Sequence, residues 1–241
     1  MSDVLPDHYE TLAPFRAAFA TGLPVLMYHK LGRPPLSARN KGLFIAPRLF
    51  ARQLAEWKLA GLASAMPDET DARGKIAITF DDGYASALEH ACEPLREHGF
   101  AAIQFLAAGF LGKTNTWDAS GEHLMDSAQV RDWLGAGHAI GAHSVTHPRL
   151  TQIAVEQARE EIVSSKRRLE DEFGVRVDHF CYPFGDWNER IAAMVAEAGY
   201  RSAVSTDVGI NTRATNPFAL KRIASYFPLR NPRNLWLTFR P

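Results

Sequence analysis

The chain has 241 residues, 46% of them hydrophobic, which is long enough for one large α/β domain with an ample core. Lys plus Arg and Asp plus Glu balance at 27 each, without a long run of either sign, so no nucleic-acid partner is expected. Two cysteines, Cys92 and Cys181, are too few for a disulfide framework or a thiolate metal cluster.

The first residues do not resemble a secretory leader. Met1–Asp7 contains acids and a proline where a leader needs basic residues followed by an apolar run. No segment approaches the roughly 18 to 20 apolar residues of a membrane span. We therefore expect no transmembrane segment and a cytoplasmic location. Nothing in the sequence indicates an oligomeric state.

Strand and helix patterns alternate along most of the chain. Residues 1–22 are expected to form a loosely attached lead-in with one helical turn near Phe15, and residues 23–241 to form a single domain. The predicted strands cover residues 24–28, 75–80, 100–106, 138–142, 175–182, 200–206 and 220–224. The predicted helices cover residues 47–61, 84–98 with a kink or break at Pro94, 127–135, 151–173 capped by Thr151, and 188–199 capped by Asn188.

This alternation predicts a parallel sheet wrapped by helices, and about seven strands favour closure into a barrel. Chemistry in such folds gathers at the C-terminal ends of the strands. A long loop at 107–126 could serve there as a substrate-facing lid, and an aromatic tail around Trp236 follows the last strand.

The stretch Thr79–Gly83 ends the second predicted strand with two adjacent carboxylates, Asp81 and Asp82. Neighbouring side chains of a strand point to opposite faces, so both can serve one site only if the chain turns there, which Gly83 permits. One carboxylate could then neutralise a cation while the other handles protons. An ordinary acidic turn is the alternative interpretation.

A second motif, His143–Pro148, places two imidazoles four residues apart. Pro148 disfavours helical geometry at His147, so we expect a bent loop after the strand. Two histidines and one carboxylate at strand ends form a typical open catalytic zinc set, although surface or capping histidines would have the same spacing.

Taken together, Thr79–Gly83 and Gly141–Pro148 resemble the motifs of the polysaccharide deacetylase family, the NodB-homology group or carbohydrate esterase family 4. Tyr182–Asp186 resembles its third motif, and the likeness extends over about residues 23–225. The resemblance implies a distorted (β/α)7 barrel that removes acetyl groups from sugars with a divalent metal, most often Zn²⁺, with Co²⁺ or Ni²⁺ as alternatives.

By that resemblance, Asp82, His143 and His147 bind the metal and Asp81 is the general base for a metal-bound water that attacks the acetyl carbonyl. A backbone N–H in the third motif, here that of Phe184, would stabilise the oxyanion, and Tyr182 lies in the same motif. The aromatic ring of Trp187, which follows that motif, could contact the substrate or pack.

The third motif departs from the family pattern, because Cys181 stands where an arginine commonly pairs with the base. A subgroup with Tyr-Pro-Phe/Tyr-Gly also lacks this arginine. Arg222, at the start of the last predicted strand, could replace it, or could be an ordinary surface arginine. Asp207, at another strand end, could also orient catalytic groups.

A second departure concerns the catalytic acid. Members of the family usually have a histidine near the C-terminus for this role, whereas the last histidine of this sequence is His179. Val25–His29 resembles the poly-β-1,6-N-acetylglucosamine deacetylase subgroup, in which the acid lies on the first strand. We therefore expect His29 to protonate the leaving amine, a capping histidine being the alternative.

The sequence thus predicts a metal-dependent carbohydrate deacetylase, a hydrolase of carbon–nitrogen bonds other than peptide bonds. Its expected partner is an acetylated saccharide, and a cytoplasmic enzyme would meet lipid-linked or small saccharides at the inner membrane face. Two alternatives remain: an amidohydrolase of small cyclic amides or formamides on the same barrel, and a non-catalytic carbohydrate-binding barrel.

Overall fold

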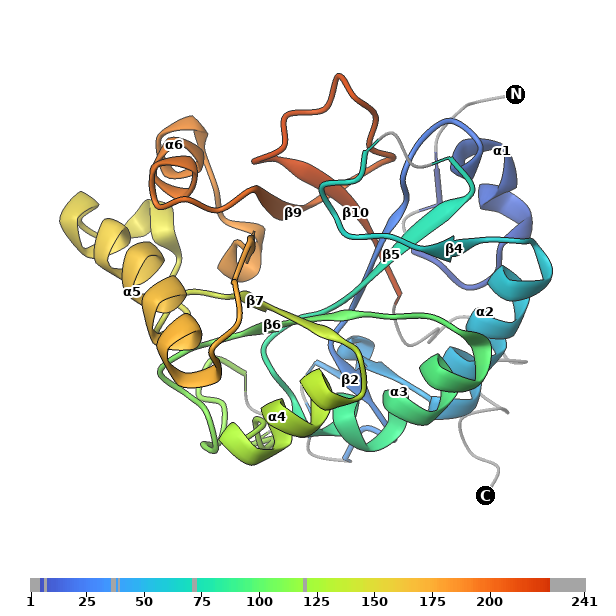
Figure 1. Ribbon diagram of the computed structural model, residues 1–241, viewed down its shortest axis with the longest axis horizontal. Coiled ribbons are helices and arrows are strands. Elements are labelled where there is room, and N and C mark those ends of the chain that lie inside the picture. Colours follow the sequence, from blue (N-terminus) through green and yellow to red (C-terminus); the bar gives the residue numbers. More distant parts are fainter. Residues whose placement is uncertain are drawn as a thin grey trace.

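The computed structural model describes residues 5–6, 8–35, 38, 40–70, 73–118 and 121–225, and Figure 1 shows their arrangement. The aromatic tail predicted around Trp236 lies outside these ranges. No helix within the described ranges has the combination of length and apolar character needed to cross a membrane.

Seven parallel strands close into a barrel. Neighbours follow the order β1-β10-β9-β8-β7-β6-β5, and β1 pairs with β5 as well as β10, with Leu26 opposite both Ile78 and Ile223. The predicted (β/α)7 barrel and its single domain are therefore confirmed. The strands are β1 (Val25–Tyr28), β5 (Lys75–Phe80), β6 (Ile103–Leu106), β7 (Ala139–Ala142), β8 (His179–Cys181), β9 (Ser202–Val208) and β10 (Leu220–Ala224).

Three shorter strands were not predicted. β4 (Ala63–Ser64) pairs with the first residues of β5, while β2 (Lys30–Leu31) and β3 (Phe44–Ile45) pair with each other. With two residues each, they are too short to show the period-2 pattern by which longer strands are found.

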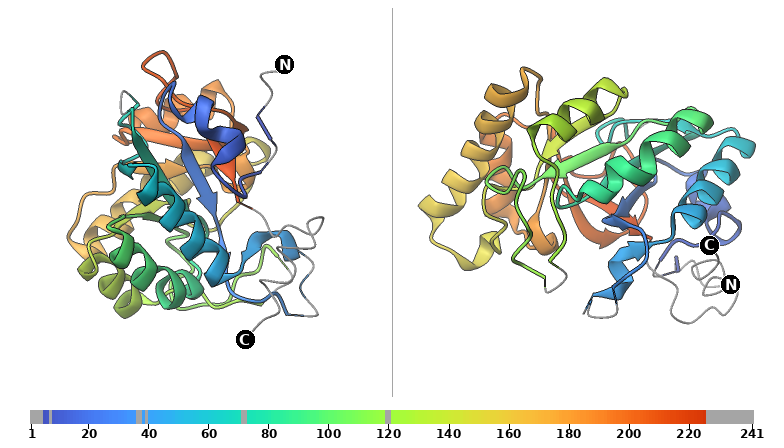
Figure 2. Two further views of the ribbon diagram at one scale, coloured as in Figure 1. Left: turned by 90° about the vertical axis from the view of Figure 1, so that its right-hand side faces the viewer. Right: turned by 90° about the horizontal axis from the view of Figure 1, so that it is seen from below.

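Helices cover the outer surface of the barrel, as the views in Figures 1 and 2 show. They are α1 (Arg16–Phe19), α2 (Pro47–Leu59), α3 (Ala85–His98), α4 (Ser127–Gly135), α5 (Val155–Phe173) and α6 (Glu189–Glu197), with 3-10 turns at Ala13–Phe15, Lys41–Leu43, Leu150–Gln152 and Pro183–Gly185. Asp126 and Gln129 form a capping box at the start of α4, and Asn188 caps α6 as predicted.

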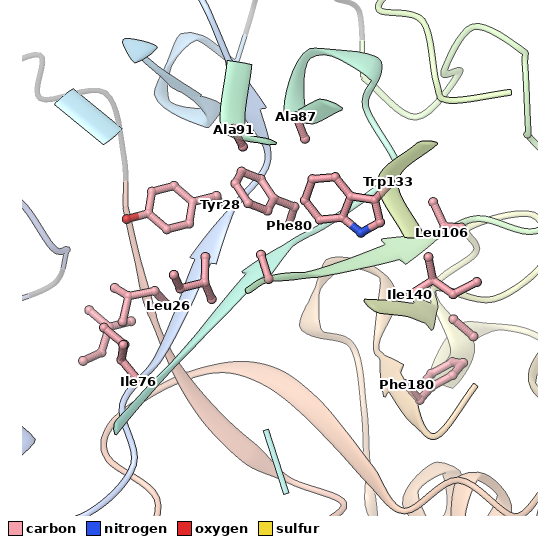
Figure 3. Packing of buried hydrophobic residues seen from close by; sticks show 14 of the residues in the cluster. Leu26, Tyr28, Ile76, Phe80, Ala87, Ala91, Leu106, Trp133, Ile140 and Phe180 are labelled. Atoms are coloured by element: carbon pink, nitrogen blue, oxygen red, sulfur yellow. The ribbon is translucent and has the colours of Figure 1, made fainter. Parts of the chain in front are cut away.

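Alternate residues of each strand pack into two separate apolar clusters. The larger cluster lies between the strands and the helices, where Phe80 and Trp133 meet the small side chains of α3 (Figure 3). The smaller cluster consists of residues on the opposite strand faces, which point into the barrel. Phe105 belongs to it and fits only because Gly141 has no side chain; a Cβ there would lie 2.5 Å from the Phe105 ring.

Two local predictions were wrong. Thr151 does not cap a helix, because its N–H and hydroxyl both donate to the Asp186 carboxylate at 2.8 Å, and α5 begins only at Val155. Of the two alternatives expected at Pro94, a kink or a break, the break is wrong: α3 continues to His98, since its buried face packs along the barrel on both sides of the proline.

The lead-in is not loosely attached where the structure describes it. Tyr9, Phe15 and Phe19 are buried and contact one another, with ring centroids 5.2 to 6.0 Å apart. The indole N–H of Trp57 on α2 donates to the Tyr9 hydroxyl at 2.6 Å. These aromatic contacts make the lead-in part of the core.

Candidate active site

A cavity of about 160 Å³ lies where the parallel strands end. Residues that follow β1, β5, β7 and β8 all reach it, because the C-terminal ends of parallel strands meet at one mouth of a barrel. Its lining consists of His29, Asn40, Leu43, Asp81, Asp82, Trp117, Asp118, His143, His147, Tyr182, Phe184, Gly185 and Thr206.

Asp81 forms a two-pronged ion pair with Arg222 of β10. Both guanidinium nitrogens lie 2.7 Å from a carboxylate oxygen, and both side chains are almost fully buried. Arg222 also donates to the Ser205 carbonyl at 2.8 Å and lies 3.2 Å from the Cys181 sulfur. Burial alone would raise the pKa of Asp81, but the charge and hydrogen bonds of Arg222 outweigh it and hold the pKa below its ordinary value. Asp81 is therefore ionised at neutral pH.

Asp82 points away from this pair because the chain leaves the strand there. Its φ of 74° lies in the left-handed region, which is uncommon for a residue with a side chain. One carboxylate oxygen, Oδ1, lies 3.3 Å from His143 Nε2 and 3.1 Å from His147 Nε2. Burial would raise the pKa of Asp82, but these two histidines hold it well below its ordinary value.

The three side chains suit a cation. His143 Nδ1 lies 2.7 Å from the Cys181 carbonyl and donates to it, so in the neutral ring Nε2 carries a lone pair. Burial lowers the pKa of His147, more than Asp82 raises it, so this ring is neutral at pH 7. Burial also acts to lower the pKa of His143, but Cys181 and Asp82 outweigh it and hold that pKa well above its ordinary value, so a cation bound here would replace the proton on Nε2. Two nitrogen donors thus converge on one carboxylate oxygen, and the ligand atoms of Asp82, His143 and His147 all lie within 4.8 Å of one another. A divalent metal fits this donor set.

His29 follows β1 and faces the Asp81 carboxylate. Its Nε2 lies 3.9 Å from Asp81 Oδ2. Burial lowers the pKa of His29, although Asp81 and Asp82 act to raise it, so the ring is neutral at neutral pH. Asp81 therefore binds a guanidinium from β10 and lies near an imidazole that follows β1, two strands that are neighbours in the closed barrel.

The third motif forms a tight turn at the cavity wall. Phe184 has a φ of 59° and is 43% exposed, while Tyr182 is fully buried and its hydroxyl donates to the Phe218 carbonyl at 2.7 Å. At Gly185 a Cβ would lie 2.0 Å from Thr206 Oγ1, so only glycine lets the turn approach β9 this closely.

Trp187 and Asp207 do not line the cavity; they contact each other instead. The indole N–H of Trp187 donates to an Asp207 carboxylate oxygen at 3.2 Å, and the Trp187 ring stacks on Tyr182 with centroids 6.0 Å apart. Neither touches the Asp81 or Asp82 carboxylate among the described contacts.

The long loop at 107–126, expected as a possible substrate-facing lid, forms part of the cavity wall, although the individual contacts of its residues were not predicted. Trp117, from the long loop at 107–126, stacks on the His147 ring with centroids 4.2 Å apart and planes 15° from parallel. Asp118, next to it, accepts from Lys30 Nζ at 2.7 Å and from the Tyr84 hydroxyl at 3.0 Å. The unusual length of that loop was the one signal that could have indicated these residues.

The match to known proteins agrees with this site. A (β/α)7 barrel with an Asp-His-His set at its mouth defines the class, and the family model for polysaccharide deacetylase matches residues 68–203. The chain belongs to the polysaccharide deacetylase family.

Individual relatives are similar to this chain in sequence or in fold. A chitooligosaccharide deacetylase from Azorhizobium caulinodans is 36% identical over 134 residues, covering 55% of this chain and 58% of that protein. The deacetylase PplD of Streptococcus pyogenes, solved in complex with acetate, is 25% identical with a TM-score of 0.74, over 91% of this chain and 99% of PplD. IcaB from Ammonifex degensii, 21% identical, shares the fold with a TM-score of 0.72 over 90% of this chain and 97% of its own.

Proposed function

We propose that this chain is a metal-dependent hydrolase that removes N-acetyl groups from N-acetylated sugars. The observation that carries the proposal is the division of two consecutive carboxylates: Asp81 faces Arg222 and His29, while Asp82 faces His143 and His147. Hydrolysis of an amide needs both a base and an electrophile next to the carbonyl, and this division supports one residue for each task.

The proposed metal ligands are Asp82, His143 and His147. A divalent ion such as Zn²⁺ bound there would supply Lewis acidity and lower the pKa of a water molecule. The carbonyl of Cys181 fixes the ring orientation of His143, as is usual for a metal-binding histidine, and Trp117 covers one face of His147.

Asp81 acts as the general base in this proposal. Arg222 keeps it ionised and fixes the direction of both carboxylate oxygens, so that it can accept a proton from the attacking water. His29 then protonates the leaving amine. Because the resting ring is neutral, its proton must be delivered during the reaction, and Asp81 Oδ2 at 3.9 Å is the nearby source.

The backbone N–H of Phe184 is the proposed donor to the oxyanion, and the Tyr182 and Trp117 rings are proposed walls of the substrate site. The substrate class is supported by the relatives, which include a chitooligosaccharide deacetylase and a deacetylase that holds acetate. We propose an acetylated amino sugar in an oligosaccharide, polysaccharide or lipid-linked form.

The test combines metal analysis with product analysis. The purified protein is stripped with a chelator, reloaded with Zn²⁺ or Co²⁺, and incubated with N-acetylglucosamine oligomers while acetate is measured. We expect one metal per chain, acetate release that depends on it, and loss of release in Asp81→Asn. Metal binding without acetate would favour a small cyclic amide or formamide substrate. Absence of metal binding would favour a carbohydrate-binding barrel.

A further inference from the structure

Glu161 of α5 is a buried acid that lies outside the cavity and contacts the loop carrying both histidines. Its Oε2 accepts the backbone N–H groups of Val145 and Thr146, each at 2.8 Å, and its Oε1 accepts the Thr146 hydroxyl at 2.6 Å. The residue is only 7% exposed, and within the described ranges no lysine or arginine forms an ion pair with it. All the hydrogen bonds described for the Glu161 carboxylate therefore go to this loop.

The loop needs such support because its backbone is unusual. Ser144 and His147 have φ values of 60° and 63°, in the left-handed region that side chains disfavour. Such conformations persist only where the surroundings determine them. Three other hydrogen bonds contribute. The Ser144 hydroxyl accepts the His147 N–H at 3.0 Å, and the carbonyls of Ser144 and Val145 accept the N–H groups of residues 108 and 109 at 3.0 and 2.8 Å.

These contacts hold the loop from two sides. Residues after β6 bind its carbonyls, whereas Glu161 binds the two central N–H groups that lie between the histidines in sequence. Without the carboxylate, these N–H groups would lose their described acceptors, and the turn that brings His147 back toward His143 would lose its hydrogen bonds on the α5 side.

We propose that Glu161 is a positioning residue for the metal site: its carboxylate fixes the backbone turn that sets the separation of the His143 and His147 imidazoles. The inference rests on the proposed metal site, to which it adds the element that preorganises it. Glu161 has no part in proton transfer, and its effect is on metal affinity and coordination geometry.

The test measures metal binding directly. Dissociation constants for Zn²⁺ and Co²⁺ are obtained by competition with a chromophoric chelator, and the visible absorption of the Co²⁺ protein reports the coordination geometry. Glu161→Ala should weaken binding by about 10- to 100-fold, the usual effect of losing a partner that orients a ligand, and should alter the Co²⁺ spectrum. Glu161→Gln should stay within a few-fold of wild type, because its carbonyl can accept both N–H groups while its amide donates to the Thr146 hydroxyl.

Two further variants complete the test. Glu161→Asp keeps the charge but is one methylene too short to reach both N–H groups, so it should bind metal several-fold more weakly even if Glu161→Ala does not fold. Glu160→Ala, at the exposed neighbouring position of α5, is the matched control and should bind as wild type.

The outcomes separate this inference from the proposed function. Wild-type affinity and spectrum in Glu161→Ala or Glu161→Asp would overturn the role of Glu161 and leave the metal site intact. A wild-type protein that binds neither Zn²⁺ nor Co²⁺ would overturn both. Weak binding by Glu161→Gln, equal to that of the alanine variant, would also refute hydrogen-bond positioning, because the isostere retains the geometry.

Discussion

Removing Arg222 should change the ionisation of Asp81 in a measurable direction. In Arg222→Leu the Asp81 carboxylate keeps its burial and loses both 2.7 Å hydrogen bonds and the adjacent positive charge. Burial is the largest influence on this group and acts to raise its pKa, so the pKa should move from below to above the ordinary value of about 3.9. In the proposed mechanism acetate release requires ionised Asp81. As the pH is lowered, acetate release by the variant should therefore decline at a higher pH than in the wild type.

Stability should change with the same pH dependence. Breaking a buried ion pair by removing one partner typically costs about 3–5 kcal/mol, a large fraction of the roughly 5–15 kcal/mol that stabilises most domains. In the wild type the lowered pKa of Asp81 stabilises the fold above pH about 4. This stabilisation is lost as the pH falls through the pKa that Asp81 has in the folded protein. In the variant the raised pKa destabilises the fold as the pH rises above about 4. The difference in unfolding free energy should therefore grow as the pH rises from 4 to 7, and the wild-type contribution should be lost only below pH about 4.

The assay is urea unfolding and acetate release, each between pH 4 and 8. Arg201→Leu is the matched control, since Arg201 forms an ion pair with Asp68 at an exposed position away from the cavity. Cys181→Arg in the Arg222→Leu background should restore part of both properties, because Cys181 lies 3.2 Å from the Arg222 guanidinium. An Arg222→Leu protein with the wild-type pH profile and stability would refute the reasoning.

Three further variants test other features of the site and the barrel. His29→Ala should lower kcat by about 10²- to 10⁴-fold with little change in KM, while the exposed His90→Ala should not; near-wild-type turnover would remove His29 as the acid. Gly185→Ala should destabilise the fold by about 1–3 kcal/mol in urea unfolding, more than Gly137→Ala. Both positions have a positive φ, 67° and 87°, but a Cβ at Gly137 would enter open space. Equal losses of stability would mean that the Thr206 side chain moves aside for the Cβ at position 185. His138→Leu should raise stability, and by more at pH 5.5 than at pH 7.5. Burial lowers the pKa of His138, so below about 6.5 the unfolded chain takes up a proton that the folded ring resists, and a pH-independent difference would contradict this.

The barrel and the convergence of strand ends could be predicted because both follow from periodic patterns. Alternating strands and helices imply parallel strands, and parallel strands place His29, Asp81 and His143 at one mouth whatever the details of packing. The sequence alone did not decide whether Arg222 pairs with Asp81 or is a surface arginine, because only closure of the barrel brings β10 within reach of β5.

Other features depend on packing that no pattern encodes. Glu161 is indistinguishable in sequence from the exposed Glu160, and only the rotation of α5 relative to the histidine loop directs one of them inward. Trp187 follows the third motif and looked suited to a substrate contact, but the turn directs it toward Asp207. The length of the loop at 107–126 indicated a possible lid, but no periodic pattern in it indicated that Trp117 stacks on His147.

The seam at which β1 meets β10 has a consequence for the order in which the site is assembled. The Asp-His-His set lies within residues 68–203. The two basic side chains described next to Asp81 come from the two sides of the seam, His29 from the end of β1 and Arg222 from β10. A nascent chain that has reached β9 already contains the three proposed metal ligands but lacks the guanidinium of Arg222. Metal affinity should thus appear before hydrolytic competence during synthesis, and a chain truncated after β9 should bind metal without activating water.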